Sequence, residues 1–202
     1  MIISAGSRSS HECPISGYVL PLAFAQSEVS FRDDVSARQD KFDISLTPYL
    51  RPVIEQWDFR GGGSREIVVM AVEQTGKSLS WQLGLVWSML YETCMSIVVY
   101  PSDDKSDEVN RSKLQPLMRS IPSLAAGLEQ PRTKARNRYH FPAFISYFQG
   151  AGERISAHPA RIRIADEVDD WFDNEDKAKS RKLDDLRTVS YTHLTLPTKR
   201  IV

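Results

Sequence analysis

A short segment near the middle of the chain carries residue types that could bind phosphate groups. Residues 71–78 read AVEQTGKS and match the phosphate-binding pattern GxxxxGK[ST], except that Ala71 replaces its first glycine. In this pattern Gly76 allows a tight backbone turn, Lys77 reaches the β- and γ-phosphates, and the Ser78 hydroxyl can ligate Mg²⁺. The segment therefore predicts a nucleoside-triphosphate site, and the alternative is a strand-to-helix turn without nucleotide.

The patterns on either side of this segment favour the nucleotide site. Residues 67–72 form a continuous apolar run rich in β-branched residues, which is typical of a strand buried on both faces. Residues 76–91 carry apolar side chains at helical spacing. A helix that begins here directs the positive end of its dipole toward bound phosphates. The residues expected to contact the nucleotide are Gln74, Thr75, Gly76, Lys77 and Ser78.

A second, acidic element would complete such a site. Residues 162–167 read IRIADE, which predicts a short strand that ends in two carboxylates. Asp166 would hold Mg²⁺ through water, and Glu167 would polarise the water that attacks the γ-phosphate. Adjacent side chains at a strand end diverge, so the two carboxylates can face different parts of the ligand. The alternative is a helix-capping aspartate beside a solvated glutamate.

The order of the strand and helix patterns indicates the fold class. Strand patterns at 67–72, 95–100, 141–148 and 161–166 alternate with helical patterns. This βαβ order predicts an α/β fold with a parallel sheet covered by helices on both faces. Together with the two motifs it indicates a P-loop NTPase of the RecA-like (ASCE) branch, which carries a catalytic glutamate beside the magnesium-associated aspartate.

Two further helices are predicted around these strands. Apolar residues at 50, 53, 54 and 57 share one face of a short helix. A longer helix follows Pro101, with Ser102 as its N-cap, and continues to Pro122. The acidic run 103–108 is therefore interpreted as a solvated first turn at the positive helix end, rather than as a metal site.

Composition excludes several classes of protein. The 202 residues include 26 Lys plus Arg and 26 Asp plus Glu, so a binder held to nucleic acid by bulk charge is disfavoured. Cys13 and Cys94 cannot form a disulfide framework. No apolar run approaches the ~20 residues of a membrane span. Residues 1–45 lack a sustained period and predict an irregular arm, and Pro21 interrupts the signal-like run at 15–25 within it.

The order and the residue sequences of these motifs resemble those of the ATPase domain of phage terminase large subunits, the DNA-packaging motors. The resemblance is greatest to the lambda-type group, often called the GpA family, and covers residues 47–171. The sequence ADEVD at 165–169, which closes a strand, is characteristic of that group. The other matching stretches are TPYLRP at 47–52, VVM at 68–70, QTGKS at 74–78, VVYP at 98–101, residues 111–119, and QGAG at 149–152.

The resemblance implies roles for individual residues. Lys77 and Ser78 correspond to the phosphate and Mg²⁺ contacts of the family, and Lys77 also stabilises charge during catalysis. Asp166 corresponds to the magnesium-associated residue and Glu167 to the catalytic glutamate. Glu73 stands where many terminases have an arginine, so the proposed trigger role of that arginine is not assigned to this position.

Two further features of the sequence each allow two interpretations. Tyr49 corresponds to an adenine-contacting aromatic residue, or else it packs against its own helix. Basic residues at 132, 134, 136 and 138 would share one face of an extended chain. Such a face could contact DNA phosphates, although a solvated loop is the favoured interpretation.

The resemblance also implies partners and domain organisation. The expected partners are double-stranded DNA, the terminase small subunit and the portal protein. The full-length protein is expected to be a homo-oligomer in the host cytoplasm, without membrane association, and to act as an endonuclease as well. Residues 46–188 are expected to be the N-terminal part of the ATPase domain. Residues 189–202 resemble a translated sequencing adapter and are expected to pack against nothing, with the nuclease domain missing from this chain.

Two other functions remain possible from the sequence. One is a helicase-like RecA-type ATPase, which the residues Val168 and Asp169 after the acidic pair disfavour. The other is a nucleotide-binding module without turnover, for which nucleotide binding without DNA-stimulated hydrolysis would be the distinguishing observation.

Overall fold

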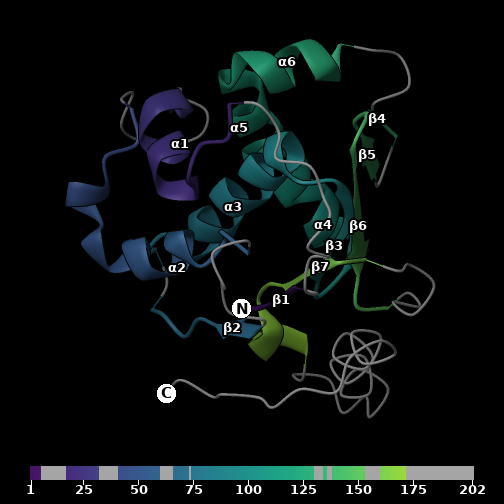
Figure 1. Ribbon diagram of the computed structural model, residues 1–202. Helices are drawn as coiled ribbons and strands as arrows, with labels where there is room; N and C mark the ends of the chain where they lie inside the picture. Colours follow the sequence, from purple (N-terminus) through teal and green to yellow (C-terminus); the bar gives the residue numbers. More distant parts are fainter. Residues whose placement is uncertain are drawn as a thin grey trace, which may run out of the picture.

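One mixed β-sheet forms the centre of the protein (Figure 1). The computed structural model describes residues 1–5, 17–31, 41–59, 66–72, 74–129, 134–135, 138–152 and 160–171. Within these residues the strand order is β2-β1-β7-β3-β6-β5-β4. The strands are β1 (Ile2–Ala5), β2 (Glu66–Val68), β3 (Cys94–Tyr100), β4 (Lys134–Ala135), β5 (Arg138–His140), β6 (Phe144–Gly150) and β7 (Ile162–Ala165).

The middle of the sheet is parallel, as the βαβ pattern predicts. Strand β3 pairs in parallel with β6 on one side and with β7 on the other, so that Val98 lies between Phe148 and Ile164. The outer pairs are antiparallel, so the predicted parallel sheet is parallel at its centre and mixed as a whole. Connections as short as the one between β5 and β6 allow only antiparallel pairing.

The strand before the phosphate loop lies at the edge of the sheet, so the prediction of a strand buried on both faces is wrong. Strand β2 pairs only with β1 among the described strands. The side chains of Val68, Met70 and Val72 are 54%, 93% and 79% exposed. The physical reason is that β1 pairs antiparallel with both β2 and β7 and thereby separates the phosphate-loop strand from the buried centre.

The N-terminal region contains regular structure where its lack of a period predicts an irregular arm. Besides β1, helix α1 (Pro21–Glu28) buries Leu22, Phe24 and Ala25. The indole Nε1 of Trp87 donates to the carbonyl of Val19 at 2.8 Å, which ties this region to the central helix. The two elements contain four and eight residues, too few for a period to be visible in the sequence.

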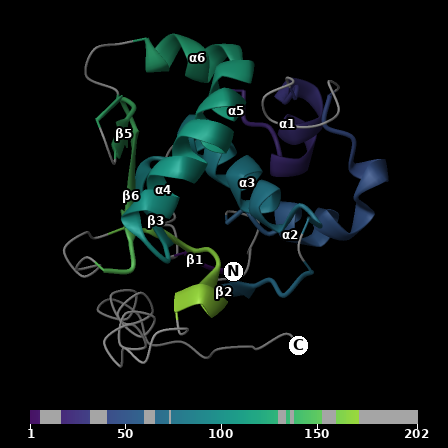
Figure 2. The same cartoon turned by 180° about the vertical axis from the view of Figure 1, so that it is seen from behind.

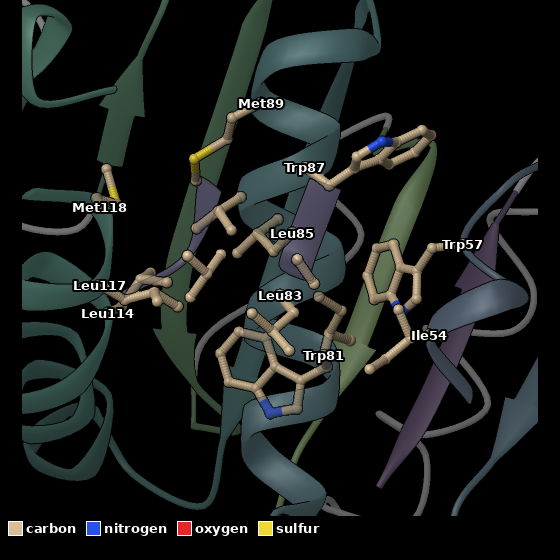
Figure 3. Packing of buried hydrophobic residues seen from close by; sticks show 14 of the residues in the cluster. Ile54, Trp57, Trp81, Leu83, Leu85, Trp87, Met89, Leu114, Leu117 and Met118 are labelled. Atoms are coloured by element: carbon tan, nitrogen blue, oxygen red, sulfur yellow. The ribbon is translucent and has the colours of Figure 1, made fainter. Parts of the chain in front are cut away.

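Helix α3 (Lys77–Tyr91) is the central helix and confirms the predicted stripe at 76–91. Trp81 and Trp87 on this helix are fully buried. Figure 3 shows the α3 side chains packed between Trp57 on one side and Leu117 on the other. Burying an apolar side chain of this size contributes roughly 1.5–3 kcal/mol, so α3 holds the other helices to the sheet. The predicted short helix around residues 50–57 is confirmed as α2 (Arg51–Glu55).

The helix predicted after β3 is also confirmed. Ser102 Oγ accepts a hydrogen bond from the backbone N–H of Lys105 at 3.2 Å, which is the expected N-cap. Asp103 and Asp104 are exposed in the first turn. The remaining helical elements are η1 (Ile44–Leu46), η2 (Pro48–Leu50), α4 (Asp103–Val109), the π-helical η3 (Asn110–Leu114), α5 (Gln115–Ser120), α6 (Pro122–Leu128) and η5 (Val168–Trp171).

Helices lie on both faces of the sheet, in unequal amounts (Figure 1, Figure 2). The α-helices cover the face that carries Val98 and Ile164. On the opposite face Trp171 of η5 packs in a smaller cluster with Val99 and Ala165. The α/β fold class, with helices around a sheet as in P-loop NTPases, is therefore confirmed.

Candidate functional site

The two predicted motifs meet where β7 ends and α3 begins. Asp166 follows β7 directly, and its backbone N–H donates to the carbonyl of Val99 on the neighbouring strand β3 at 3.1 Å. Ser78 lies in the first turn of α3, and its Oγ donates to Asp166 Oδ2 at 2.9 Å. The carboxyl ends of parallel strands are the usual position of ligand sites in α/β sheets. The structure therefore brings together two residues that are 88 positions apart.

The Asp166 carboxylate is buried and accepts three hydrogen bonds from described residues. Only 1% of the residue is exposed. Its Oδ2 accepts from Ser78 Oγ at 2.9 Å and from Trp81 Nε1 at 2.8 Å. Its Oδ1 accepts from the backbone N–H of Glu167 at 3.0 Å. A carboxylate offers about four acceptor positions, so these bonds occupy both positions on Oδ2 and leave one on Oδ1.

The chemistry of these donors fits Mg²⁺. The Ser78 hydroxyl uses its hydrogen for Asp166, so its oxygen lone pairs can ligate a cation. The remaining acceptor position on Asp166 Oδ1 can receive a hydrogen bond from a water of the metal's hydration shell. Mg²⁺ retains several waters and needs few protein oxygens beside substrate phosphates. Among the described residues, no group of three or more His, Cys, Asp or Glu side chains forms a separate metal site.

The described residues of the predicted phosphate loop, 71–72 and 74–78, have features that suit a bound anion. Gln74 and Gly76 both have left-handed φ angles, of 59° and 79°. Thr75 Oγ1 donates to the carbonyl of Val72 at 2.6 Å and closes the loop. Gly76 is the N-cap of α3, and no side chain caps this helix end. The N–H groups of the first helical turn have no partner within the helix, which suits a bound phosphate.

The charge of Lys77 acts on the same ionisable groups as the predicted carboxylates. It is the first residue of α3 and is half-buried. Burial and then the charge of Lys77 lower the pKa of the Met1 ammonium, while Asp166 and Asp169 act to raise it. The same Lys77 charge opposes the burial that raises the pKa of Glu167. The predicted phosphate contact therefore lies close to the predicted magnesium and catalytic residues.

Glu167 occupies a strained and partly buried position. Its φ is 50°, a left-handed value that is uncommon outside glycine. Burial raises the pKa of its carboxyl, and the nearby charges of Asp166 and Asp170 add to this effect. Lys105 opposes it, with its Nζ 3.9 Å from Glu167 Oε1. A carboxyl with a raised pKa at the end of a strand has the property that a general base requires.

Three residues near this site were not predicted from the sequence. Trp81 lies three positions after Ser78 and so shares its helix face, a spacing that could have identified it. Tyr100, the last residue of β3, is 1% exposed and packs edge-on against Trp81 with ring centroids 6.2 Å apart. Its hydroxyl has no hydrogen-bond partner among the described residues. Lys105 belongs to the acidic run interpreted as solvated, and no spacing in the sequence connects it to Glu167.

The other predicted candidates remain untested or fall outside the described residues. Tyr49 is 55% exposed, and its correspondence to an adenine-contacting residue stays a prediction. Lys134 lies in β4, and Arg138 is an exposed residue of β5. The basic residues at 132 and 136, Glu73 of the loop and the segment 189–202 fall outside the described residues.

A comparison with sequence families gives a match to the family described as phage terminase large subunit gpA, ATPase domain, over residues 36–196. The matched region begins within the predicted arm and includes both the phosphate loop and the acidic strand end. It ends within the segment that resembles an adapter. A search of curated proteins and a search of solved structures give no match.

Proposed function

The chain belongs to the family of phage terminase large subunit ATPase domains, and from this premise we propose that it hydrolyses ATP with Mg²⁺ to drive viral double-stranded DNA into a procapsid. The observation that carries the proposal is the hydrogen bond from Ser78 Oγ to Asp166 Oδ2 at 2.9 Å. An NTPase site needs a phosphate loop and an acidic strand end at one place, and each motif alone is a weak indicator. This bond joins the two motifs.

In the proposed site the loop and the start of α3 bind the triphosphate. Backbone N–H groups of Gln74, Thr75 and Gly76 surround the phosphates, supported by the left-handed φ angles of the first and last of these residues. The Lys77 ammonium contacts the β- and γ-phosphates and stabilises the charge that develops on the transferred group. Ser78 Oγ and Asp166 hold Mg²⁺, which when bound neutralises charge on the phosphate oxygens.

Glu167 is the proposed catalytic base. A water molecule attacks the γ-phosphorus in line, and its proton passes to the Glu167 carboxylate. The bond between the γ-phosphorus and the bridging oxygen of the β-phosphate breaks, which yields ADP and inorganic phosphate. The raised pKa of Glu167 supports this role, because it makes the carboxylate a better proton acceptor than an ordinary surface glutamate. Lys105 limits this increase in pKa.

The finer biological assignments are also proposals. We infer double-stranded DNA, the terminase small subunit and the portal protein as partners, a homo-oligomeric full-length protein, and action in the host cytoplasm. Endonuclease activity is proposed for a longer protein that carries a nuclease domain. None of the helices in the described part of the chain has the length and apolar character of a membrane span.

Lys77→Ala tests nucleotide binding. The substitution removes a cation that faces several phosphate charges, and each charge-assisted contact contributes about 1.5–3 kcal/mol. Calorimetry should show at least a roughly tenfold loss of affinity for ATP with Mg²⁺. The matched control is Lys113→Ala, at an exposed position on η3, which should bind as the unmodified chain does. Equal affinity in Lys77→Ala and Lys113→Ala would contradict the assignment of the loop.

Glu167→Gln tests hydrolysis apart from binding. The amide can still form hydrogen bonds but cannot accept the proton of the attacking water. ATP affinity should be retained, while phosphate release falls by about 10²–10⁴-fold. Release within about threefold of the unmodified protein would exclude Glu167 as the general base. If the unmodified chain binds ATP but releases no phosphate with or without DNA, the module without turnover becomes the favoured function.

A further inference from the structure

We propose that Trp81 is a positioning residue whose indole N–H holds the Asp166 carboxylate in the orientation that receives Mg²⁺ with nucleotide. The inference rests on the proposed function, because it concerns the same site. Trp81 Nε1 donates to Asp166 Oδ2 at 2.8 Å, and both residues are at most 1% exposed. Hydrogen bonds to a buried carboxylate are stronger than those between neutral groups.

The position of this bond determines which carboxylate oxygen remains available. Oδ2 accepts from both Trp81 and Ser78, so its two acceptor positions are occupied. Oδ1 accepts only from the backbone N–H of Glu167 among the described residues. Removing the indole N–H frees an acceptor position on Oδ2 and allows the carboxylate to rotate about its Cβ–Cγ bond. Trp81 therefore keeps Oδ1 as the oxygen that faces a ligand.

The other tryptophans show that a buried indole in this protein does not require a carboxylate. Trp87 Nε1 donates to the backbone carbonyl of Val19 at 2.8 Å, and Trp171 Nε1 donates to the backbone carbonyl of Asp166 at 3.1 Å. Trp57 Nε1 is buried without a hydrogen-bond partner among the described residues. A buried indole N–H in this protein can therefore donate to a backbone carbonyl or have no acceptor among the described residues. The charged acceptor of Trp81 is a specific feature of the site.

Neighbouring aromatic packing fixes the plane of the Trp81 ring. The ring of Tyr100 contacts it at an interplanar angle of 63°. Both residues belong to the main core cluster, and Figure 3 shows the Trp81 side chain among the core residues around α3. Aromatic pairs in such edge-on arrangements are favourable beyond their buried area. The Tyr100 ring therefore restricts the orientation of the indole that carries this N–H.

The test compares Trp81→Phe with Trp87→Phe in the full chain. Each variant removes one buried indole N–H from α3, so both should lose thermal stability, and Trp81→Phe should lose more because its acceptor is charged. The Mg²⁺ dependence of binding is measured by calorimetry with a non-hydrolysable ATP analogue. In Trp81→Phe the Mg²⁺ concentration at half-maximal binding should rise about tenfold or more, the usual effect of losing a partner of a metal ligand. In Trp87→Phe it should not change.

Three outcomes separate the inference from the proposed function. A rise in Trp81→Phe alone supports the positioning role. An equal Mg²⁺ dependence in the unmodified chain, Trp81→Phe and Trp87→Phe overturns it while leaving the proposed function intact. Absence of Mg²⁺-dependent nucleotide binding in the unmodified chain overturns both.

A second measurement avoids dependence on the folding of Trp81→Phe. The unmodified chain contains four tryptophans, so ¹⁵N-tryptophan labelling gives four indole N–H resonances. Trp57→Phe, Trp87→Phe and Trp171→Phe each remove one resonance and assign the fourth to Trp81. Addition of the analogue with Mg²⁺ should shift the Trp81 resonance more than those of Trp57 and Trp87. A Trp81 resonance that does not move would overturn the inference.

Discussion

The two halves of the candidate site differ in how completely their polar groups are satisfied. In the acidic half, the Asp166 carboxylate accepts three hydrogen bonds from described residues and is 1% exposed. In the loop half, Met70 and Val72 are 93% and 79% exposed, and the N-terminus of α3 has no side-chain cap. The groups that hold the Asp166 carboxylate, the proposed magnesium-associated residue, are therefore arranged by the protein itself. The groups proposed to face phosphate are left for a ligand to satisfy.

The difference follows from the position of each half in the sheet. Strand β7, which precedes Asp166, has β3 on one side and β1 on the other. Strand β2, which precedes the loop, pairs only with β1 among the described strands. A central strand can bury a charged group among donors from several elements, whereas an edge strand leaves its end open to solvent. The Asp166 carboxylate is therefore part of the fold, whereas the loop is proposed to be mainly a binding element.

Asp166→Ala is expected to have the largest effect and tests whether the acidic half is part of the fold. It leaves the N–H of Trp81 and the hydroxyl of Ser78 without their acceptor, and each buried unsatisfied group costs about 1–3 kcal/mol. The free energy of unfolding, measured in urea, should fall by about 2–4 kcal/mol. Asp169→Ala is the control at an exposed position, and it should change stability by less than about 0.5 kcal/mol. If the free energy of unfolding changed by a similarly small amount in Asp166→Ala and Asp169→Ala, the acidic half would be no more a part of the fold than the loop half.

Gly76→Ala tests the loop half and should have an intermediate effect. The left-handed φ of 79° disfavours any residue with a Cβ, by about 1–2 kcal/mol. The added Cβ would also lie 3.1 Å from Leu50 Cδ1. Urea unfolding should show a loss of this size, and calorimetry should show weaker ATP binding because the loop backbone shifts.

Gly152→Ala provides the matched control for this substitution. A Cβ at Gly152 meets no atom within 4 Å, and this glycine has no left-handed φ. Its stability should stay within about 0.5 kcal/mol of the unmodified chain. If Gly76→Ala destabilised the chain more than Asp166→Ala does, the loop half would be the more rigidly determined part, and the comparison would be reversed.

Local patterns in the sequence predicted individual helices and strands around the candidate site better than they predicted the order of the sheet. The helical stripe after Gly76, the N-cap at Ser102 and the strand before Asp166 each depend on neighbouring residues, and the structure confirms all three. The edge position of β2 depends on pairing with Ile2–Ala5, a short and distant segment that local periodicity cannot detect. An apolar run such as residues 67–72 does not by itself show whether its strand lies at the edge or at the centre of a sheet.

Local sequence patterns also could not predict hydrogen bonds and ion pairs between side chains of distant elements. The contact of Trp81 with Asp166 joins residues 85 positions apart; the spacing from Ser78 places Trp81 on the same helix face but does not reveal its acceptor. Lys105 approaches Glu167 across two elements, although its own neighbours indicate a solvated turn. Pairing of this kind depends on the folded arrangement of α3, α4 and β7, which is established only once the sheet order is known.

The smallest expected effect concerns the ionisation of Glu167, the second carboxylate of the acidic half. Its pKa is raised, mainly by burial, and Lys105 is the largest opposing influence. Because the folded pKa lies above the unfolded one, Glu167 favours the folded state at acid pH, and this contribution is lost as the pH rises through the folded pKa. The rate of catalysis depends on pH in the opposite direction from stability, because only the ionised Glu167 carboxylate accepts a proton. Phosphate release should therefore increase as the pH rises through the pKa of Glu167.

Lys105→Gln sharpens this prediction. Without the cation, whose Nζ lies 3.9 Å from Glu167 Oε1, the pKa of Glu167 should rise further, and the acid limb of the rate profile should move to higher pH. Steady-state phosphate release across a pH series measures the shift, with Lys113→Gln on exposed η3 as the control. At pH well above the acid limb the Lys105→Gln variant and its control should have the same rate. An acid limb that stays in place, or moves to lower pH, would show that Lys105 does not act on the ionisation of Glu167.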